Sequence, residues 1–437
     1  MPSHIDRNPD HSRHAVNMLS ENARATSRRV AVIGAGIVGT TIALRLVEEG
    51  HEVTLLDPDP PGQGASYGNA GSVSPGSIVP LALPGTIKSI PRWMADPLGP
   101  LSVSLLHGPR LLPWLHLFWR AGRVDRVKEI VRAMQTLQHD CVEAYDGMLH
   151  DAGVPELLVR EGMLHVFRTE QAYASSAFAR QLRIDRGVTV RLLSAEEIRR
   201  HSPHLADSYR FGFLLPDGAH VRNPERVVRS LSLRFEARGG QRLSARVEGF
   251  DVRKGRVRGL CTQRGVLQDT DVVLAAGIGS VALAKQLGVR VPVVAERGYH
   301  IQIEDPQIDV SRPVTDAEAK CVATPMEGGL RFAGTSEFTS ERAPPNWKRA
   351  EVLERHARTM YPAVTLRGVR RWTGSRPSTP DSMPVVCEVP RHPGVFFAFG
   401  HGHWGLMSAP ATARLVADLV ARRAPSIDAH PFHVARF

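Results

Sequence analysis

Three glycines near the beginning of the chain have a spacing that suits phosphate binding. Gly34, Gly36 and Gly39 follow the short buried-strand pattern at 29–33, and apolar side chains then recur at helical spacing over 40–49. In such a unit the first glycine makes a tight turn, the second lets the backbone approach a pyrophosphate, and the third lets helix and strand pack closely. The motif alone is weak evidence, but its place between a strand and a helix predicts a dinucleotide site.

An acidic residue completes this unit. Asp57 follows the apolar run 51–56, where a carboxylate can accept a hydrogen bond from a ribose hydroxyl. The phosphates are expected at the helix N-terminus, beside Ile37 and Val38, because free backbone amides and the helix dipole favour anions there. NAD and FAD share this unit, so the rest of the chain must distinguish them.

The segment after Asp57 favours FAD. Residues 62–76 are mostly small, so their backbone amides can lie flat against a planar ligand. The candidate contacts in this segment are Ser66, Asn69, Ala70 and Gly71. A surface loop is the alternative, because glycine and serine are also common in ordinary turns.

The pattern of a nucleotide-binding domain resumes far along the chain. Residues 271–275 predict a buried strand that ends in a small-residue turn containing Ala276 and Gly277. Before it, two short strands form a hairpin-like pair over 245–260, which includes Val247. An interrupted domain of this kind is typical of two-domain flavoproteins, so FAD is the expected cofactor.

These segments together resemble the D-amino acid oxidase-like FAD-dependent oxidoreductases, and within them the bacterial D-amino acid dehydrogenases. The most specific match is the loop 66–76, and the stretch 399–412 is similar to the D-hydroxyproline-oxidising members. The resemblance covers the chain from Arg28 to its end. It implies FAD, loss of a hydride from the substrate α-carbon, and an imino acid product.

Arg376 is the residue that the resemblance assigns to the substrate carboxylate. It lies in the stretch 372–381, which matches the family's Gly-x-Arg-Pro segment from Gly374 onward. Pro377 favours an extended backbone at Arg376, and a planar guanidinium can bind a carboxylate through two parallel hydrogen bonds. A structural salt bridge is the alternative.

Tyr299 is a second candidate. It lies at the start of an expected strand over 296–303, similar to the family's entry into the substrate domain. Its hydroxyl could face the ligand, but strand alternation puts it on the same face as Ile301 and Ile303, so a core position is the alternative. The adjacent His300 would point the other way.

His401 and His403 would share one face if they lay in a strand, as two metal ligands do, but no third ligand accompanies them. We therefore expect no metal. The resemblance places both under the flavin ring, with His403 as a catalytic candidate and Gly402, Gly405 and Leu406 in close contact with the cofactor. It also implies that a helix near 408–420 points its positive end at the flavin.

The four cysteines, Cys141, Cys261, Cys321 and Cys387, stand far apart without a C-x-x-C pair. This spacing suits neither a disulfide scaffold nor a zinc ribbon, and it indicates a reducing, cytoplasmic compartment. No cysteine or histidine stands where neighbouring branches of the family tether FAD. FAD is therefore expected to be non-covalent, and Cys387 to be a buried small residue.

The expected fold class is α/β: a Rossmann-like, doubly wound FAD-binding domain with a second, mostly antiparallel α+β substrate domain. The FAD-binding domain is assigned to 28–100, 206–290 and 366–437, a helical insert to 101–149, and the substrate domain to 150–205 and 291–365. Residues 1–27 are polar and lack an apolar signal core, so we expect a disordered tail or a true start near Met18.

Two segments before the substrate domain have a pattern of their own. Apolar side chains recur at helical spacing over 125–150, which predicts a packing helix. The tryptophan-rich segment 98–119 contains three prolines, which excludes a membrane-spanning helix. It predicts either core-facing short helices or an interfacial patch at the inner face of the cytoplasmic membrane.

The 437 residues carry a formal net charge of +11, which alone suits nucleic acid or an anionic membrane. The arginines are scattered, so we expect no nucleic-acid partner and at most weak membrane attraction. The leading hypothesis is oxidation of a D-amino acid or cyclic imino acid, with electrons passed to a quinone or other carrier. The alternatives are a glycine- or sarcosine-type oxidase that uses dioxygen, and a non-catalytic FAD carrier subunit, for which Arg376 would be unnecessary.

Overall fold

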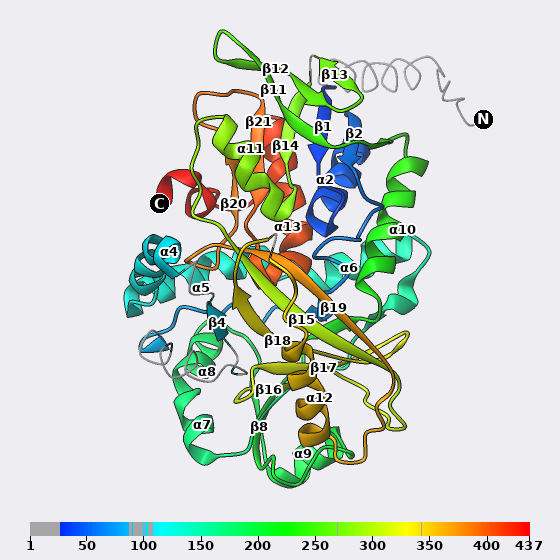
Figure 1. Ribbon diagram of the computed structural model, residues 1–437, viewed down its shortest axis with the longest axis vertical. Coiled ribbons are helices and arrows are strands. Elements are labelled where there is room, and N and C mark those ends of the chain that lie inside the picture. The colour runs from blue at the N-terminus through cyan, green and yellow to red at the C-terminus, as the bar shows by residue number, and fades with distance from the viewer. Residues whose placement is uncertain are drawn as a thin grey trace, which may run out of the picture.

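The computed structural model describes residues 27–86, 90, 99, 101–103, 108–268, 270–341 and 343–437. Two large sheets lie one above the other in Figure 1, the six-stranded sheet in the upper half and the nine-stranded sheet in the lower half. The prediction for residues 1–26 lies outside the described residues, as does the part of the tryptophan-rich segment that contains Leu98.

The upper sheet is mainly parallel, because only its edge strand β20 runs antiparallel to its neighbour β21. Its order is β10 (Gln241–Ser244), β2 (Glu52–Asp57), β1 (Arg29–Ile33), β14 (Asp271–Leu274), β21 (Val395–Phe399) and β20 (Val385–Glu388). Alternate residues of β1 enter different cores, Val30 and Val32 on one face and Ala31 and Ile33 on the other. Both faces are therefore covered, as expected for a parallel sheet.

Helices cover one face of this sheet, and a helix with a small sheet covers the other. Helices α2 (Ile37–Glu48), α10 (Pro224–Ala237) and α13 (Gly405–Val420) belong to the first layer. The second layer contains α11 (Ser280–Gln286) and the antiparallel strands β11 (Val247–Arg253), β12 (Arg256–Thr262) and β13 (Gly265–Gln268). The expected α/β class and the hairpin over 245–260 are confirmed.

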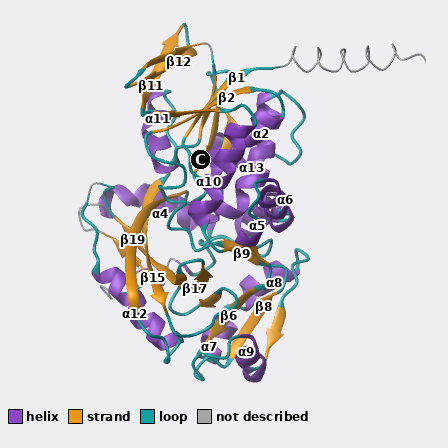
Figure 2. Cartoon of the chain, turned by 90° about the vertical axis from the view of Figure 1, so that its right-hand side faces the viewer, coloured by secondary structure: helices purple, strands orange, loops and turns teal. Residues whose placement is uncertain are grey.

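The lower sheet is mostly antiparallel. Its path is β19 (Arg367–Ser378), β15 (Val294–Asp305), β18 (Gly329–Phe338), β17 (Cys321–Met326), β16 (Val314–Asp316), β6 (Met163–Phe167), β8 (Phe211–Leu215) and β7 (Arg191–Leu193), with β4 (Leu101–Val103) beside β18. Helix α12 (Lys348–Met360) packs on β15 and β18. Helices α7 (Glu170–Ser175) and α9 (Ala195–His201) lie at the far end (Figure 2). Helix α8 (Ala177–Ile184) lies nearer the middle, where its Arg183 donates a hydrogen bond to the Gly76 carbonyl oxygen.

Three strands belong to a different sheet from the one that the expected domain boundaries imply. Strands β8 and β19 fall in segments assigned to the FAD-binding domain, yet both pair within the nine-stranded sheet. Strand β4 falls in the expected helical insert and pairs with β18. A three-stranded sheet of β3 (Ser72–Val73), β9 (Ala219–Val221) and β5 (Leu158–Val159) lies beside them. The proposed division therefore follows the two large sheets, with β8 and β19 on the substrate side.

The insert contains α4 (Gly108–Ala121), α5 (Val124–Gln138) and α6 (Cys141–Asp151). The single packing helix expected over 125–150 is wrong, because the chain turns at His139 and Asp140. Asp140 is bound there to Arg414 of α13 by two hydrogen bonds of 2.7 and 2.9 Å. No helix among the described residues is both long and apolar enough to cross a membrane.

Candidate functional site

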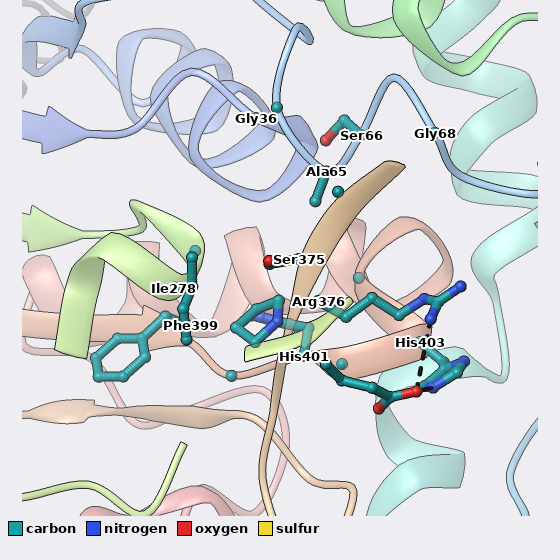
Figure 3. Close-up of a pocket in the computed structure, with 18 of the residues that line it drawn as sticks. Gly36, Ala65, Ser66, Gly68, Ile278, Ser375, Arg376, Phe399, His401 and His403 are labelled. Carbon is teal, nitrogen blue, oxygen red and sulfur yellow. Dashed lines mark hydrogen bonds and ion pairs between the residues drawn. The ribbon is translucent and has the colours of Figure 1, made fainter. Parts of the chain in front are cut away.

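A cavity of about 1480 Å³ lies between the two large sheets. It is larger than the 300–1,000 Å³ typical of small-molecule pockets, so a dinucleotide and a small substrate can share it. Its walls come from the glycine-rich turn, the small-residue segment, the start of α13, the ends of β15, β18 and β19, and α4. Figure 3 shows Arg376 and His403 together in this cavity, apart from Gly36 and Ser66.

The glycine-rich turn has the geometry that a pyrophosphate needs. Helix α2 begins at Ile37 after Gly36, which has no side chain to cap it. The Ser66 hydroxyl accepts a hydrogen bond of 3.0 Å from the Ile37 amide and so joins the turn to the small-residue segment. At Gly39 a Cβ would lie 1.8 Å from the Gly34 carbonyl oxygen, so helix and strand can approach this closely only with glycine there.

Asp57 lies at the end of β2, at the edge of the same cavity. Its carboxylate accepts hydrogen bonds from the backbone amides of Ala35, at 2.7 Å, and Asp59, at 3.0 Å. Burial raises the pKa of Asp57, and these two amides oppose part of that effect. An uncapped helix N-terminus with an acid on the adjacent strand fits the diphosphate and ribose of a dinucleotide.

A side chain of the lower sheet binds the backbone of the loop 66–71. Arg331 on β18 donates hydrogen bonds to the carbonyl oxygens of Tyr67, at 3.0 Å, and Asn69, at 2.6 Å. The Asn69 side chain accepts one from the Gly71 amide at 2.8 Å. Gly71 itself has a φ of +77° and faces Val221, not the cavity.

The structure brings most of the expected cofactor residues to one place. Besides Gly39 and Gly71, which serve packing and the turn, every predicted position lines the cavity. These are Gly34, Gly36, Ile37, Val38, Asp57, Ser66, Asn69, Ala70, Val247, Ala276, Gly277, Gly374, Gly402, Gly405 and Leu406. Helix α13 begins at Gly405, earlier than expected, so its first turn forms part of the wall.

Arg376 on β19 points into the cavity and lies beside Glu296, its cross-strand neighbour on β15. Its Nη1 is 3.5 Å from Glu296 Oε1, and His403 Nε2 lies 2.8 Å from the same oxygen. Gly298 makes room for the arginine, since a Cβ there would lie 2.2 Å from the guanidinium. The expected carboxylate-binding side chain is thus at the cavity, beside a carboxylate of the chain itself.

Tyr299 does not reach the cavity. Its ring is 1% exposed and belongs to the core beneath the lower sheet, together with Ile301 and Ile303. Its hydroxyl donates to Glu337 Oε2 at 2.6 Å and accepts from the Asn346 amide at 2.9 Å. The expectation that the Tyr299 hydroxyl faces the ligand is therefore wrong. Strand alternation turns Tyr299 to the face of the sheet away from the cavity, where it is a core residue.

The neighbouring His300 lies on the other face, as expected from alternation. Its ring stacks on Trp372 with centroids 5.1 Å apart, and Nδ1 lies 3.3 Å from the Gly68 carbonyl oxygen. Burial, with the charge of Arg331, lowers the pKa of His300 to about 3. A neutral imidazole at this place packs against the small-residue loop.

The two C-terminal histidines face different partners. The chain turns at Gly402, with a φ of +52°, into a short helical turn, Gly402–Trp404, so the two histidines do not share the face of a strand. His401 Nε2 lies 3.1 Å from the Thr412 hydroxyl, and burial lowers its pKa to about 3. His401 is thus a neutral imidazole in the cavity wall that is bound to α13, whereas His403 binds Glu296.

Glu296 is the site residue that sequence reasoning missed. The stretch 296–303 marked a strand, but nothing in it showed which cross-strand neighbour the carboxylate would meet. The hydroxyls of Ser378, at 2.7 Å, and Ser336 also donate hydrogen bonds to the Glu296 carboxylate.

Among the described residues there is no group of three or more His, Cys, Asp or Glu side chains that could hold a metal. Cys387 is buried, and its burial raises the thiol pKa to about 11.

Comparison with known proteins identifies the family. The model of the FAD dependent oxidoreductase family matches residues 29–419. The chain belongs to this family. It is an FAD-dependent enzyme, and the cavity fits that cofactor.

Individual relatives span nearly the whole chain. A D-amino-acid oxidase from Bradyrhizobium diazoefficiens is 37% identical, over 94% of this chain and 99% of that protein. A D-amino acid dehydrogenase 2 from Ralstonia nicotianae is 32% identical, over 93% and 100%. Glycine oxidase from Geobacillus kaustophilus has the same fold, with a TM-score of 0.73 and 22% identity over 94% of this chain and 99% of that one.

Proposed function

We propose that this enzyme oxidises D-amino acids, including cyclic ones such as D-hydroxyproline, and passes the electrons to a quinone or another carrier. The observation that carries the proposal is Arg376, whose guanidinium lines the cavity. Its protein partner is Glu296, at a distance of 3.5 Å between Nη1 and Oε1. An electron-carrying subunit would need no such group. The names of the Bradyrhizobium and Ralstonia relatives support a D-amino acid substrate.

Gly36, Ser66 and Asp57 would hold FAD in the cavity, and bound FAD would supply the acceptor for a hydride from the substrate α-carbon. Arg376 binds the substrate carboxylate through its free nitrogens and thereby fixes the orientation of the α-carbon–hydrogen bond. The amine reacts in its neutral form, and the product is an imino acid. The aromatic and apolar wall from α4, Trp114 and Phe118 among it, excludes water from the reacting atoms.

The deciding experiment is Arg376→Ala, followed by anaerobic flavin reduction with D- and L-amino acids, glycine, sarcosine and both hydroxyproline epimers. Removing one partner of a buried charge pair costs about 2–5 kcal/mol, which corresponds to a loss of about 30-fold to several thousand-fold in kcat/KM. Arg376→Lys should rescue little, because an ammonium cannot bind both oxygens in parallel. A variant that keeps FAD and is reduced at near wild-type efficiency would refute the proposal.

The carrier is a separate part of the proposal, because the relatives include both an oxidase and a dehydrogenase. Helix α4 supports a carrier that approaches from a membrane surface, such as the inner face of the cytoplasmic membrane. It lines the cavity with Leu111 and exposes Leu112 and Trp119 to solvent. Hydrogen peroxide formed at the rate of substrate loss, without added dye or quinone, would instead identify an oxidase.

A further inference from the structure

One buried carboxylate links the expected substrate clamp to the nearby imidazole. Glu296 is 2% exposed, and its Oε1 lies 2.8 Å from His403 Nε2 and 3.5 Å from Arg376 Nη1. The Ser378 hydroxyl donates to Oε2 at 2.7 Å, and the Ser336 hydroxyl donates to Oε1. These four partners come from three elements, Arg376 and Ser378 from β19, Ser336 from β18 and His403 from the turn before α13, so the carboxylate is fixed from several sides.

This carboxylate is ionised. Burial alone would raise the pKa of Glu296, but the charge and hydrogen bond of His403, followed by the charge of Arg376 and the Ser336 hydroxyl, lower it well below its usual range. A buried ion of this kind is stable only where its partners are fixed and its lone pairs are used. The cluster is therefore an ordered unit at the cavity wall.

The nitrogens of the Arg376 guanidinium differ in their contacts, because only Nη1 contacts Glu296. Glu296 is paired with Arg376 across β15 and β19, and it engages only Nη1. Within the described part of the chain Arg376 makes no other hydrogen bond or ion pair. The remaining nitrogens are thus available to a ligand carboxylate while Nη1 is held.

The same contact has an electrostatic disadvantage. A substrate carboxylate at Arg376 would lie near a second anion, and like charges in a site of low dielectric repel. Glu296 therefore weakens the binding of the substrate anion. Such an arrangement is useful only if it improves the orientation in which the substrate is held.

We propose that Glu296 is a positioning residue, an anion that fixes Arg376 and His403 toward the cavity. It lowers the affinity for the substrate carboxylate and improves the orientation in which the substrate is held. This inference rests on the proposed function, because it assumes that Arg376 binds the substrate carboxylate.

The test is Glu296→Gln in the FAD-loaded enzyme, with two readouts. The first is the dissociation constant of propionate, a carboxylate without an oxidisable amine, measured by calorimetric titration. We expect propionate to bind about threefold to tenfold more tightly, because the competing anion is gone. The second is the rate of anaerobic flavin reduction at saturating substrate, which we expect to fall about 10-fold to 100-fold, because a clamp misplaced by about 1 Å has that effect.

A rise in propionate affinity together with a fall in the reduction rate distinguishes this role from a purely structural one, since a damaged site would lose both affinity and rate. Glu337→Gln is the matched control: it makes the same substitution on β18, but its carboxylate faces the other side of the sheet and binds Tyr299 and Arg297. Neither readout should change there. If Glu296→Gln does not fold, Glu296→Asp keeps the charge on a shorter stem and should slow reduction without tightening propionate binding.

Three results would overturn the proposal. They are unchanged reduction in Glu296→Gln, weaker propionate binding in that variant, or tighter propionate binding in Glu296→Asp. Arg376→Ala separates this failure from failure of the proposed function. If it binds propionate like the wild type, the carboxylate site itself is wrong; if it loses propionate while Glu296→Gln behaves like the wild type, only the role of Glu296 is wrong.

Discussion

At the scale of single residues, the sequence was informative where one side chain carries the chemistry. Arg376 and Asp57 were found from their motifs, and both line the cavity. Glu296 was missed because its role depends on the register of β15 against β19, which pairs it with Arg376. For the same reason the sequence does not decide the role of Tyr299. Alternation predicts which residues share its face, but the packing of α12 against the sheet decides which face lies toward the cavity.

Gly298 gives a test at this scale. A Cβ at this position would lie 2.2 Å from the Arg376 guanidinium, so Gly298→Ala should move the clamp without removing it. Because a guanidinium is a flexible group, the melting temperature should stay within a few degrees, while KM for the best amino acid rises about tenfold or more. Gly147→Ala on α6 is the control, since nothing lies within 4 Å of its added Cβ. Equal KM values in the two variants would contradict the predicted clamp position.

At the scale of elements, local patterns predicted strands and helices well but not the contacts between distant ones. The turn between β1 and α2, the hairpin of β11 and β12, and β14 all follow from nearby residues. The break between α5 and α6 did not, because Asp140 is held by Arg414 from the far end of the chain. The contact of β18 with the loop 66–71 was equally invisible, since it joins residues more than 260 positions apart.

Arg331 tests that contact. It is 6% exposed and binds two carbonyl oxygens of the loop, so Arg331→Leu should free the loop and leave those oxygens without a protein donor. We expect the FAD dissociation constant to rise about tenfold, with near-normal flavin reduction once FAD saturates the enzyme. Arg370→Leu, an exposed residue of β19 paired with Glu304, should leave FAD affinity unchanged. Equal affinities in both variants would show that the loop needs no anchor from β18.

At the scale of the whole molecule, the interrupted nucleotide-binding pattern and the family resemblance together predict two sheets with FAD between them. They could not predict the boundaries, because a strand joins a sheet through its neighbours. Strand β19 pairs with β15 along nearly its full length, while the segment that follows it returns to the upper sheet at β20 and β21. The cavity is thus built from segments spread over the entire chain, so cofactor binding and global stability should be linked.

That linkage gives two measurements on FAD. Since no tethering cysteine or histidine is expected, acid precipitation should leave the flavin in the supernatant, and flavin in the pellet would contradict non-covalent binding. Adding FAD back at about 100 times its dissociation constant should stabilise the apoprotein by about 2.7 kcal/mol.

Asp57→Ala should reduce that gain. A hydrogen bond to a charged group contributes about 1.5–3 kcal/mol, so losing the ribose acceptor should raise the FAD dissociation constant about 10-fold to 100-fold and shrink the melting-temperature shift at the same FAD concentration. Asp57 also accepts the amides of Ala35 and Asp59, so the apoprotein itself must be measured to separate loss of the turn from loss of the ribose contact. Asp146→Ala, an exposed position on α6 paired with Arg160, should keep the full shift, and a full shift in Asp57→Ala would remove the ribose role from this residue.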